Sequence, residues 1–228
     1  VFFTGRDGTM RSNRIFCQLA GHYSDLFIGS TLQIDLEGNS STATLARITG
    51  FGGAPNFGSE SRGRRHGSEP WLKAGAEAQR GNHMPRGRKL VVQIVETFRE
   101  GLSPTFVERL DAWALQESFG LPLPPVMVYG DDLTHIVTEE GIANLLLCDG
   151  PQEREQAIRG VAGYTEVGMA RDRAMIERLR AKGAVAYPED LGVDARLATR
   201  DLLAARSIKD LVRWSEGLYD PPARFRNW

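Results

Sequence analysis

The sequence predicts an α/β protein in which helices flank an open β-sheet. The continuous apolar run at residues 90–95 is typical of a strand that is covered on both of its faces. Residues 26–36 alternate apolar and polar side chains, as a half-buried strand does. Apolar residues in the stretch 107–114 recur instead at helical spacing. Strands that alternate with helices along the chain indicate an α/β architecture.

The amino-terminal part is predicted to contain three strands and one helix. Residues 1–4 resemble a short buried strand, and residues 12–20 suit a helix with one apolar face. The strand at residues 26–36 should turn its polar side chains toward solvent. A turn at residues 37–40 then leads to a strand at residues 42–49.

The middle of the chain should continue this alternation. Ser103 is expected to cap a helix with Pro104 in its first turn, because serine is a favoured N-cap and proline fits the first helical position. Short strands are predicted at residues 126–129 and 135–138. Residues 142–147 either begin a helix or continue as apolar packing.

The carboxy-terminal part is predicted to be helical. Asp149 is expected to cap a helix that begins at Pro151, and residues 171–182 form a second helix that the following glycine closes. Ser207 with Asp210 resembles a capping box in which aspartate replaces glutamate.

These patterns suggest an α/β domain at residues 1–165. A helical extension at residues 166–228 should pack on it, so that the two form one structural unit.

Length and composition exclude several classes of protein. The 228 residues suffice for a sizeable core, and the net charge of −1 provides no general attraction to nucleic acid. No apolar run is long enough to span a membrane, and no signal peptide is visible. Cys17 and Cys148 lie far apart without metal-ligand spacing, which favours a reduced, cytoplasmic protein. Because the sequence begins at Val1 in a strand-like stretch, we expect it to be a fragment of a longer polypeptide.

A cluster of glycines follows the predicted strand at residues 42–49. It contains Gly50, Gly52, Gly53 and Gly58. Exposed backbone N–H groups in such a loop form a concavity that can hold an anion or stabilise an oxyanion. An ordinary surface turn is the alternative. The cluster does not match the dinucleotide-binding fingerprint, which counts against a nucleotide-dependent oxidoreductase.

Residues 59–88 are the most basic part of the chain. Arg62, Arg64 and Arg65 lie there, and the planar guanidinium matches carboxylates and phosphates. The segment is either a solvated loop or a wall of an anion site. Trp71 is its only aromatic residue, which argues against nucleic-acid binding.

Two adjacent carboxylates end the predicted strand at residues 135–138. Glu139 and Glu140 could serve as a nucleophile, a base or a substrate-orienting group, or they could simply be solvated. Because neighbouring strand residues point to opposite faces, only one of the two should enter a given cleft. His66 and His83 have no ligand partner at metal spacing, so no metal site is expected.

Three motifs in this order resemble the family I coenzyme A transferases. They read Ile34-Asp35-Leu36-Glu37-Gly38, Gly50-Phe51-Gly52-Gly53 and Val137-Thr138-Glu139-Glu140-Gly141-Ile142-Ala143. Residues 3–14, 50–58, 62–68 and 219–228 are similar, more narrowly, to the alpha-subunit family of bacterial malonate decarboxylases. At this level the resemblance covers nearly the whole chain, as the carboxy-terminal part of a longer subunit.

The resemblance implies a coenzyme-A-transferase-like sheet and an acyl-carrier-protein transferase. Malonate would displace acetate from an acetyl thioester on a carrier protein, and partner subunits of the complex would decarboxylate the malonyl thioester. The chain would bind no cofactor by itself, because the thioester is carried on a dephospho-coenzyme-A-derived prosthetic group of the carrier protein.

The resemblance also implies roles for individual residues. In such transferases a glutamate attacks the thioester, and here its position would fall before Val1. Glu139 matches another active-site glutamate, and the N–H groups of Gly52 and Gly53 would hold the oxyanion.

We expect three kinds of residue to contact the substrate: glycine-loop residues, a second glutamate, and arginines for the second carboxylate of malonate. They are Gly50, Asn56, Glu140, Arg62, Arg64 and Arg65, with Arg6 and Arg11 behind the three arginines. The alternative function is a non-catalytic scaffold or carrier-docking half, whose nucleophile lies in an upstream segment.

Overall fold

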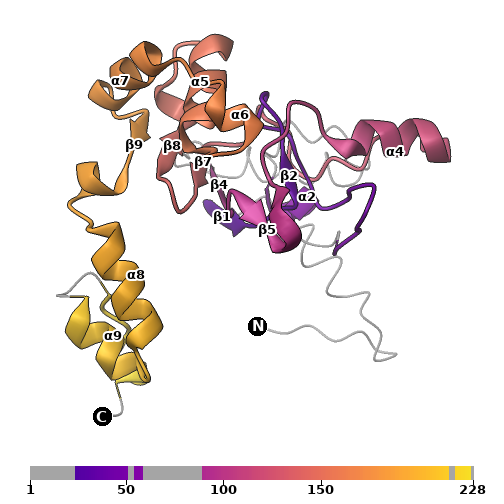
Figure 1. Cartoon of the computed structure of the whole chain (residues 1–228). Coiled ribbons are helices and arrows are strands. Elements are labelled where there is room, and N and C mark those ends of the chain that lie inside the picture. Colours follow the sequence, from indigo (N-terminus) through magenta and orange to yellow (C-terminus); the bar gives the residue numbers. More distant parts are fainter. Residues whose placement is uncertain (1–23, 51–53, 59–88, 216–218, 227–228) are drawn as a thin grey trace, which may run out of the picture. The chain divides into compact units, whose positions relative to one another are not determined.

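The computed structural model describes residues 24–50, 54–58, 89–215 and 219–226 (Figure 1). The predicted strand at residues 1–4 and helix at residues 12–20 lie outside these ranges. Contacts between residues divide the chain into a first unit that ends at Val185 and a second that begins at Ala186.

A five-stranded mixed sheet forms the centre of the first unit. Its strands, in spatial order, are β1 (Leu26–Gly29), β4 (Leu90–Ile94), β7 (His135–Val137), β8 (Ile142–Asn144) and β9 (Val185–Ala186). β1, β4 and β7 are parallel neighbours, whereas β8 is antiparallel to β7. This sheet confirms the predicted α/β class, and it confirms the strands predicted at residues 90–95 and 135–138.

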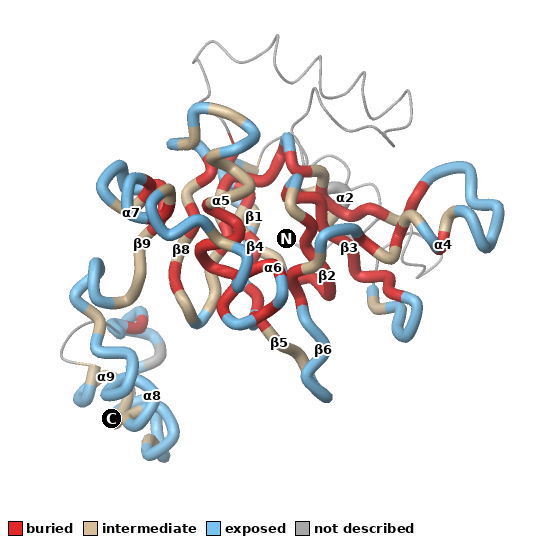
Figure 2. Tube along the Cα trace, turned by 45° about the horizontal axis from the view of Figure 1, so that its top comes forward, coloured by how far each residue is buried: buried red, intermediate tan, exposed pale blue. Residues whose placement is uncertain are grey.

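Burial alternates along the strands of the sheet, and Figure 2 colours each residue by its burial. Val91, Gln93 and Ile136 are buried on one face. On the other, Leu90 is 39% and Ile94 is 49% exposed. The prediction that both faces of β4 are covered is therefore wrong for this structure.

The connection after β1 contains β2 (Gln33–Ile34) and β3 (Ser40–Ser41), an antiparallel pair. The predicted alternation of buried and solvated residues is wrong here, because Gln33 and Asp35 are only 6% and 4% exposed. Both polar side chains have internal partners. Gln33 Oε1 accepts a hydrogen bond from Asp111 N at 2.9 Å, and the Asp35 carboxylate accepts three.

The strand predicted at residues 42–49 is also wrong. These residues form a tight turn in which Thr44 N donates to Arg47 O at 2.7 Å and Thr49 N donates to Thr42 O at 2.9 Å. A single bridge joins Ala43 to Ile48. A short helix, α2 (Ala54–Phe57), lies within the glycine cluster, directly before Gly58.

In the connection between β4 and β7, the helix start predicted at Ser103 and Pro104 is wrong. Ser103 and Pro104 form β6 (Ser103–Pro104), which pairs with β5 (Phe98–Arg99) across the one-turn helix η1 (Glu100–Leu102). They do not begin a helix. The helix α4 (Asp111–Phe119) starts later and buries Ala112 and Leu115. The strand predicted at residues 126–129 is reduced to one bridge, between Ser40 and Val128.

A helical layer packs beside β7 and β8 (Figure 1). Residues 142–147 form β8 and the single turn η2 (Leu145–Leu147), which resolves the alternatives left open there. The helices are α5 (Pro151–Val161), α6 (Glu166–Met169) and α7 (Arg173–Ala181). The predicted helix end at Gly183 is confirmed, because this glycine has a left-handed φ of 76°.

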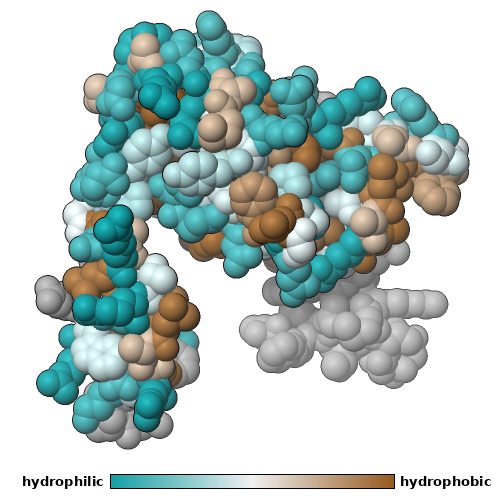
Figure 3. Space-filling view, in the orientation of Figure 1, coloured by the Kyte–Doolittle hydropathy of each residue, from teal (hydrophilic) through white to brown (hydrophobic). Residues whose placement is uncertain are grey.

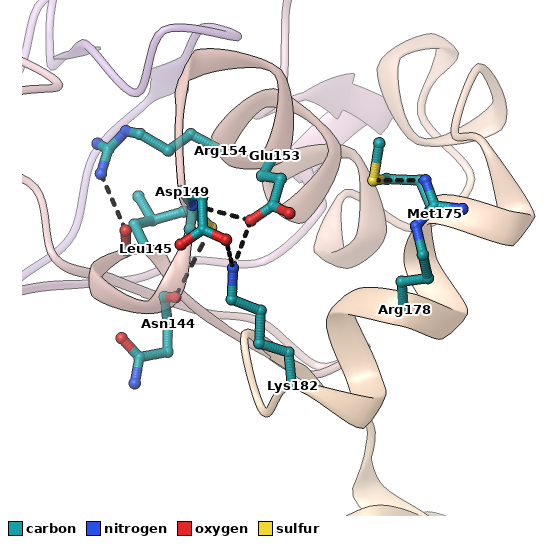
Figure 4. Close-up of polar contacts among 9 residues, drawn as sticks. Asn144, Leu145, Asp149, Glu153, Arg154, Met175, Arg178 and Lys182 are labelled. Atoms are coloured by element: carbon teal, nitrogen blue, oxygen red, sulfur yellow. Dashed lines mark hydrogen bonds and ion pairs between the residues drawn. The ribbon is translucent and has the colours of Figure 1, made fainter.

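Charged side chains join the start of α5 to the end of α7 (Figure 4). Lys182 Nζ lies 2.6 Å from Asp149 Oδ2 and 2.7 Å from Glu153 Oε2. Asp149 was predicted to cap α5, and this prediction is wrong. The N-cap residue of α5 is Gly150, which has no side chain that could cap the helix. Asp149 therefore pairs with Lys182 instead of capping the helix.

The second unit consists of short helices. They are η3 (Pro188–Leu191), α8 (Ala195–Ala204), α9 (Ile208–Trp214) and η4 (Ala223–Phe225). The predicted cap at Ser207 is confirmed, since its Oγ accepts a hydrogen bond from Asp210 N at 3.2 Å. Neither α8 nor α9 contains a buried residue, and Leu202 and Leu203 are 63% and 82% exposed. Figure 3 shows apolar side chains, coloured brown, on the surface of this unit.

The division of the chain falls later than the expected boundary after residue 165. Helix α7 belongs to the first unit because it packs on α5. Gly160 permits this close packing. A Cβ atom at that position would lie 2.9 Å from Ile176 Cδ1.

Candidate functional site

The carboxyl ends of β1, β4 and β7 lie at one edge of the sheet. The three strands are parallel and in register, since Gly29 pairs with Gln93 and Gln93 pairs with Ile136. In open α/β sheets, ligands bind outside this edge, in the loops that follow the strands. The two predicted glutamates lie in the turn that follows β7, so the fold places them at this edge.

Thr97, in the loop after β4, holds the carboxylate of Glu139. Its backbone N–H donates to Glu139 Oε1 at 3.0 Å and to Oε2 at 3.1 Å, and its hydroxyl donates a short hydrogen bond to Oε1. Thr97 is 4% exposed, so it presents these donors from a buried position. Both oxygens of Glu139 are therefore engaged.

The turn that carries the glutamates is fixed by Thr138. Its hydroxyl accepts hydrogen bonds from Glu140 N at 3.1 Å and Gly141 N at 3.3 Å, and it donates to Val161 O at 2.9 Å. The last bond joins the turn to the end of α5. The position of the glutamates thus depends on the helix as well as on the sheet.

Gly163, two residues after α5, completes this contact. It has a left-handed φ of 61°, which glycine adopts more readily than other residues. A Cβ atom there would lie 3.0 Å from Thr97 Cγ2 and 3.2 Å from Glu140 Cγ. Three segments that are distant in sequence therefore meet at the glutamate turn.

The described ends of the glycine cluster are Gly50 and Gly58. Gly50 is exposed, its carbonyl accepts a hydrogen bond from Thr42 Oγ1 at 3.3 Å, and a Cβ atom there would meet nothing within 4 Å. Gly58 is buried, and a Cβ atom there would lie 2.7 Å from Val128 Cγ2 and 3.2 Å from Phe27 Cε1. The cluster thus ends against Phe27 of β1.

The Asp35 motif forms a buried turn. Asp35 Oδ1 accepts hydrogen bonds from Glu37 N at 3.1 Å and Asn39 N at 2.8 Å, and Asn39 Oδ1 accepts one from Gly130 N at 3.0 Å. Burial raises the pKa of the Asp35 carboxyl, although the hydrogen bonds from Asn39 oppose that rise. These partners give Asp35 a structural role.

His135 is half-buried on β7, beside the buried side chain of Thr134. Its Nδ1 lies 3.0 Å from Thr134 Oγ1, and burial lowers the pKa of the imidazole. Among the residues that the structure describes, no group of histidine, cysteine, aspartate and glutamate side chains could hold a metal ion. Within the same residues, no helix has the length and apolar character needed to cross a membrane.

Comparison with known proteins identifies the family. Residues 1–228 match the family described as "malonate decarboxylase, alpha subunit, transporter". The chain belongs to this family. The resemblance to the alpha-subunit family of malonate decarboxylases is thereby confirmed.

Relatives of this family member match it across its length. It is 60% identical over 233 residues to the acetyl-S-ACP:malonate ACP transferase of Malonomonas rubra, an alignment that covers 100% of this chain and 42% of the relative. A Pseudomonas malonate decarboxylase hetero-tetramer in complex with malonate contains a chain with 56% identity and a TM-score of 0.70, covering 100% of this chain and 41% of that one. The malonate decarboxylase alpha subunit of Acinetobacter baumannii has 55% identity and a TM-score of 0.70, with 97% and 42% covered. The chain therefore spans about two fifths of the length of these relatives.

The structure brings together only some of the residues predicted for the site of this family member. Glu139 and Glu140 share the turn after β7, and Gly50 lies at the exposed start of the glycine cluster. Asn56 belongs to α2, but its side chain lies outside the described part of the chain. The remaining candidates, which also lie outside it, are Gly52, Gly53, Arg62, Arg64, Arg65, Arg6 and Arg11.

Sequence reasoning missed Thr97 and Gly163. Thr97 lies three residues after β4, where a loop at the carboxyl end of a parallel strand is a general signal for a site. Gly163 follows a helix, where glycine is common for reasons of backbone conformation alone. Neither residue carries a local signal that it contacts the glutamate turn.

Proposed function

We propose that this chain supplies the carboxy-terminal part of an acyl-carrier-protein transferase. The enzyme would exchange the acetyl group of a carrier-bound thioester for malonate and release acetate. The observation that carries this proposal is the 60% identity, across the entire chain, to a protein named acetyl-S-ACP:malonate ACP transferase. The position of Glu139 and Glu140 at the carboxyl edge of the parallel strands supports it.

The proposed mechanism divides one exchange into easier steps through a covalent intermediate. A glutamate carboxylate oxygen attacks the thioester carbonyl carbon, the C–S bond breaks, and an acyl-glutamyl anhydride forms. Malonate then attacks the glutamyl carbonyl carbon of this anhydride and acetate leaves, which gives a malonyl-glutamyl anhydride. The thiolate attacks the malonyl carbonyl carbon, the bond to the glutamate oxygen breaks, and the malonyl thioester and the free glutamate result. The backbone N–H groups of Gly52 and Gly53 are proposed to hold the oxyanion that forms during each attack.

The nucleophile is proposed to lie outside this chain. Both carboxylate oxygens of Glu139 accept hydrogen bonds from Thr97, and such bonds stabilise the carboxylate and reduce its reactivity. This observation favours a shared site to which the chain contributes the glycine cluster and the glutamate turn. It also keeps open the second candidate function, a non-catalytic scaffold or carrier-docking half.

The partners are part of the proposal. A carrier protein with a dephospho-coenzyme-A-derived arm would deliver the thioester, and decarboxylase subunits would consume the malonyl product. The name of the Malonomonas rubra relative includes the carrier protein, and the Pseudomonas relative is a hetero-tetramer. The coenzyme-A-transferase likeness of the sheet, a cytoplasmic location and the absence of a cofactor bound by this chain itself belong to the same proposal. Arg62, Arg64 and Arg65 are proposed to bind the second carboxylate of malonate.

The test is transfer of labelled malonate onto an acetylated carrier protein. We expect transfer by a full-length transferase that contains this chain, and none by the chain alone. Transfer by the chain alone would show that the nucleophile lies within this chain. Glu139 and Glu140 would then be the first candidates for that nucleophile. If the full-length protein forms the complex but transfers nothing, the scaffold function replaces the enzymatic one.

A further inference from the structure

The two neighbouring glutamates have different surroundings. Glu139 reaches back to the loop after β4, where Thr97 donates to both of its oxygens. Glu140 packs its Cγ near Gly163, because a Cβ atom at that glycine would lie 3.2 Å away. Glu139 is exposed and Glu140 is half-buried. Within the described ranges of the chain, Glu140 donates its backbone N–H to Thr138, and no hydrogen bond or ion pair engages its carboxylate.

Thr97 is a rigid partner for Glu139. Its backbone N–H bonds to the carboxylate, and its carbonyl accepts a hydrogen bond from Thr105 N at 2.9 Å. Thr105 O in turn accepts a hydrogen bond from Ile34 N at 2.8 Å, which ties this loop to β2. Since Thr97 is also buried, its backbone N–H and hydroxyl are held in fixed positions for Glu139.

We propose that Glu139 is a positioning residue held by Thr97, and that Glu140 is the carboxylate that faces the substrate. This inference rests on the proposed transferase function and refines it. The motif resemblance assigns the active-site glutamate to Glu139, whereas this inference assigns the contact with the substrate to Glu140. Thr97 thereby becomes a second positioning residue, because it acts on the site through Glu139.

The chemistry of Glu140 indicates which substrate group it contacts. An ionised carboxylate only accepts hydrogen bonds, and it repels another carboxylate. It therefore suits the amide N–H and hydroxyl groups of the carrier arm rather than malonate or acetate. Glu140 binds the arm that presents the thioester, while Glu139 and Thr97 hold the turn in place.

Kinetics of the complete transferase test this division of roles. Glu140→Gln should raise KM for the acetylated carrier about 3- to 10-fold and leave KM for malonate unchanged. Thr97→Val and Glu139→Gln should each lower kcat about tenfold, which corresponds to one weakened interaction of about 1.4 kcal/mol. Thr97→Ser keeps the hydroxyl and should restore most of kcat. Glu96→Gln changes an exposed neighbouring carboxylate and is the matched control.

Coupling between the two positions separates a positioning role from general damage. The double variant Thr97→Val/Glu139→Gln should be no slower than the slower single variant, because both changes weaken the same contact. Three results would overturn the inference: multiplied losses in the double variant, a Glu139→Gln loss of a thousandfold beside an unaffected Thr97→Val, or an unchanged carrier KM in Glu140→Gln. An inactive wild-type transferase would instead reject the proposed function. In that case the same double-variant cycle, measured by urea unfolding, still tests the Thr97–Glu139 contact.

Discussion

Replacing Gly163 with alanine should destabilise the first unit more than the same change at Gly183. Both glycines follow a helix and have left-handed φ values, 61° and 76°. For alanine, that conformation costs about 1–2 kcal/mol at either position. Only Gly163 has close neighbours, since its Cβ would lie 3.0 Å from Thr97 Cγ2 and 3.2 Å from Thr97 Oγ1. The nearest atom at Gly183 would be Leu147 Cδ1, at an ordinary 3.8 Å.

The close contact at Gly163 determines how much more stability Gly163→Ala loses than Gly183→Ala. Forcing a methyl group into a well-packed place costs about 1–3 kcal/mol in addition to the backbone term. We therefore expect Gly163→Ala to lower the free energy of unfolding by about 2–5 kcal/mol, and Gly183→Ala by about 1–2 kcal/mol. At about 2–4 °C of Tm per kcal/mol for a chain of this size, the two variants should be clearly separated.

Urea unfolding followed by circular dichroism measures both variants against the unmodified chain. Equal unfolding free energies for the two variants would refute the reasoning, because they would mean that the loop after β4 moves away at no cost. In the complete transferase, Gly163→Ala should also lower kcat, since it displaces Thr97 from Glu139. Gly183→Ala should leave kcat unchanged.

Three further outcomes follow from contacts elsewhere in the first unit. Gly130→Ala should lower the free energy of unfolding by more than about 3 kcal/mol, because its Cβ would lie 1.9 Å from a backbone carbonyl oxygen. Gly150→Ala should lower it by at most about 1 kcal/mol, because a Cβ atom there would meet nothing within 4 Å. Similar urea midpoints for these two variants would contradict the packing of the buried turn. Burial raises the pKa of Cys148 to about 11, so at pH 8 its peptide should be alkylated by iodoacetamide much more slowly in the folded than in the unfolded chain, as followed by mass spectrometry. Equal labelling rates would rule out that shift. Burial lowers the pKa of His135 below its ordinary value of 6.5, so its contribution to stability is present above pH 6.5 and is lost as the pH falls through the lowered pKa. His135→Gln should therefore flatten the dependence of Tm on pH just below 6.5, and an unchanged slope would contradict the assignment.

Local patterns predicted the elements whose residues interact mainly with near neighbours in sequence. The apolar run became β4, and the helix that begins at Pro151 became α5. The Ser207 cap joins residues three apart, so its partners are visible in the sequence. Such features depend on backbone preference and short-range hydrogen bonds, both of which a sequence displays directly.

Predictions failed where strand pairing or a distant partner determined the local structure. Ser103 and Pro104 fit the start of a helix, but they pair with Phe98 and Arg99 as strand β6 instead. Gln33 has a polar side chain that was expected to face solvent, yet it is buried and accepts a hydrogen bond from Asp111, 78 residues away. No short window of sequence around Gln33 contains that partner.

The candidate site shows the same limit in its chemistry. Recognising the motif made Glu139 and Glu140 candidate site residues, but a motif does not state which carboxylate other residues hold. That difference comes from Thr97, 42 residues before Glu139, and from Gly163, which lies beyond the next helix. In the proposed arrangement, the carboxylate that accepts three hydrogen bonds from a buried threonine orients the turn. Its neighbour, whose carboxylate accepts none within the described part of the chain, can accept bonds from a substrate. The proposed roles of these two adjacent and chemically identical side chains thus depend on the tertiary contacts around them. Exchanging Thr97 for valine or serine therefore tests the site more directly than replacing either glutamate alone.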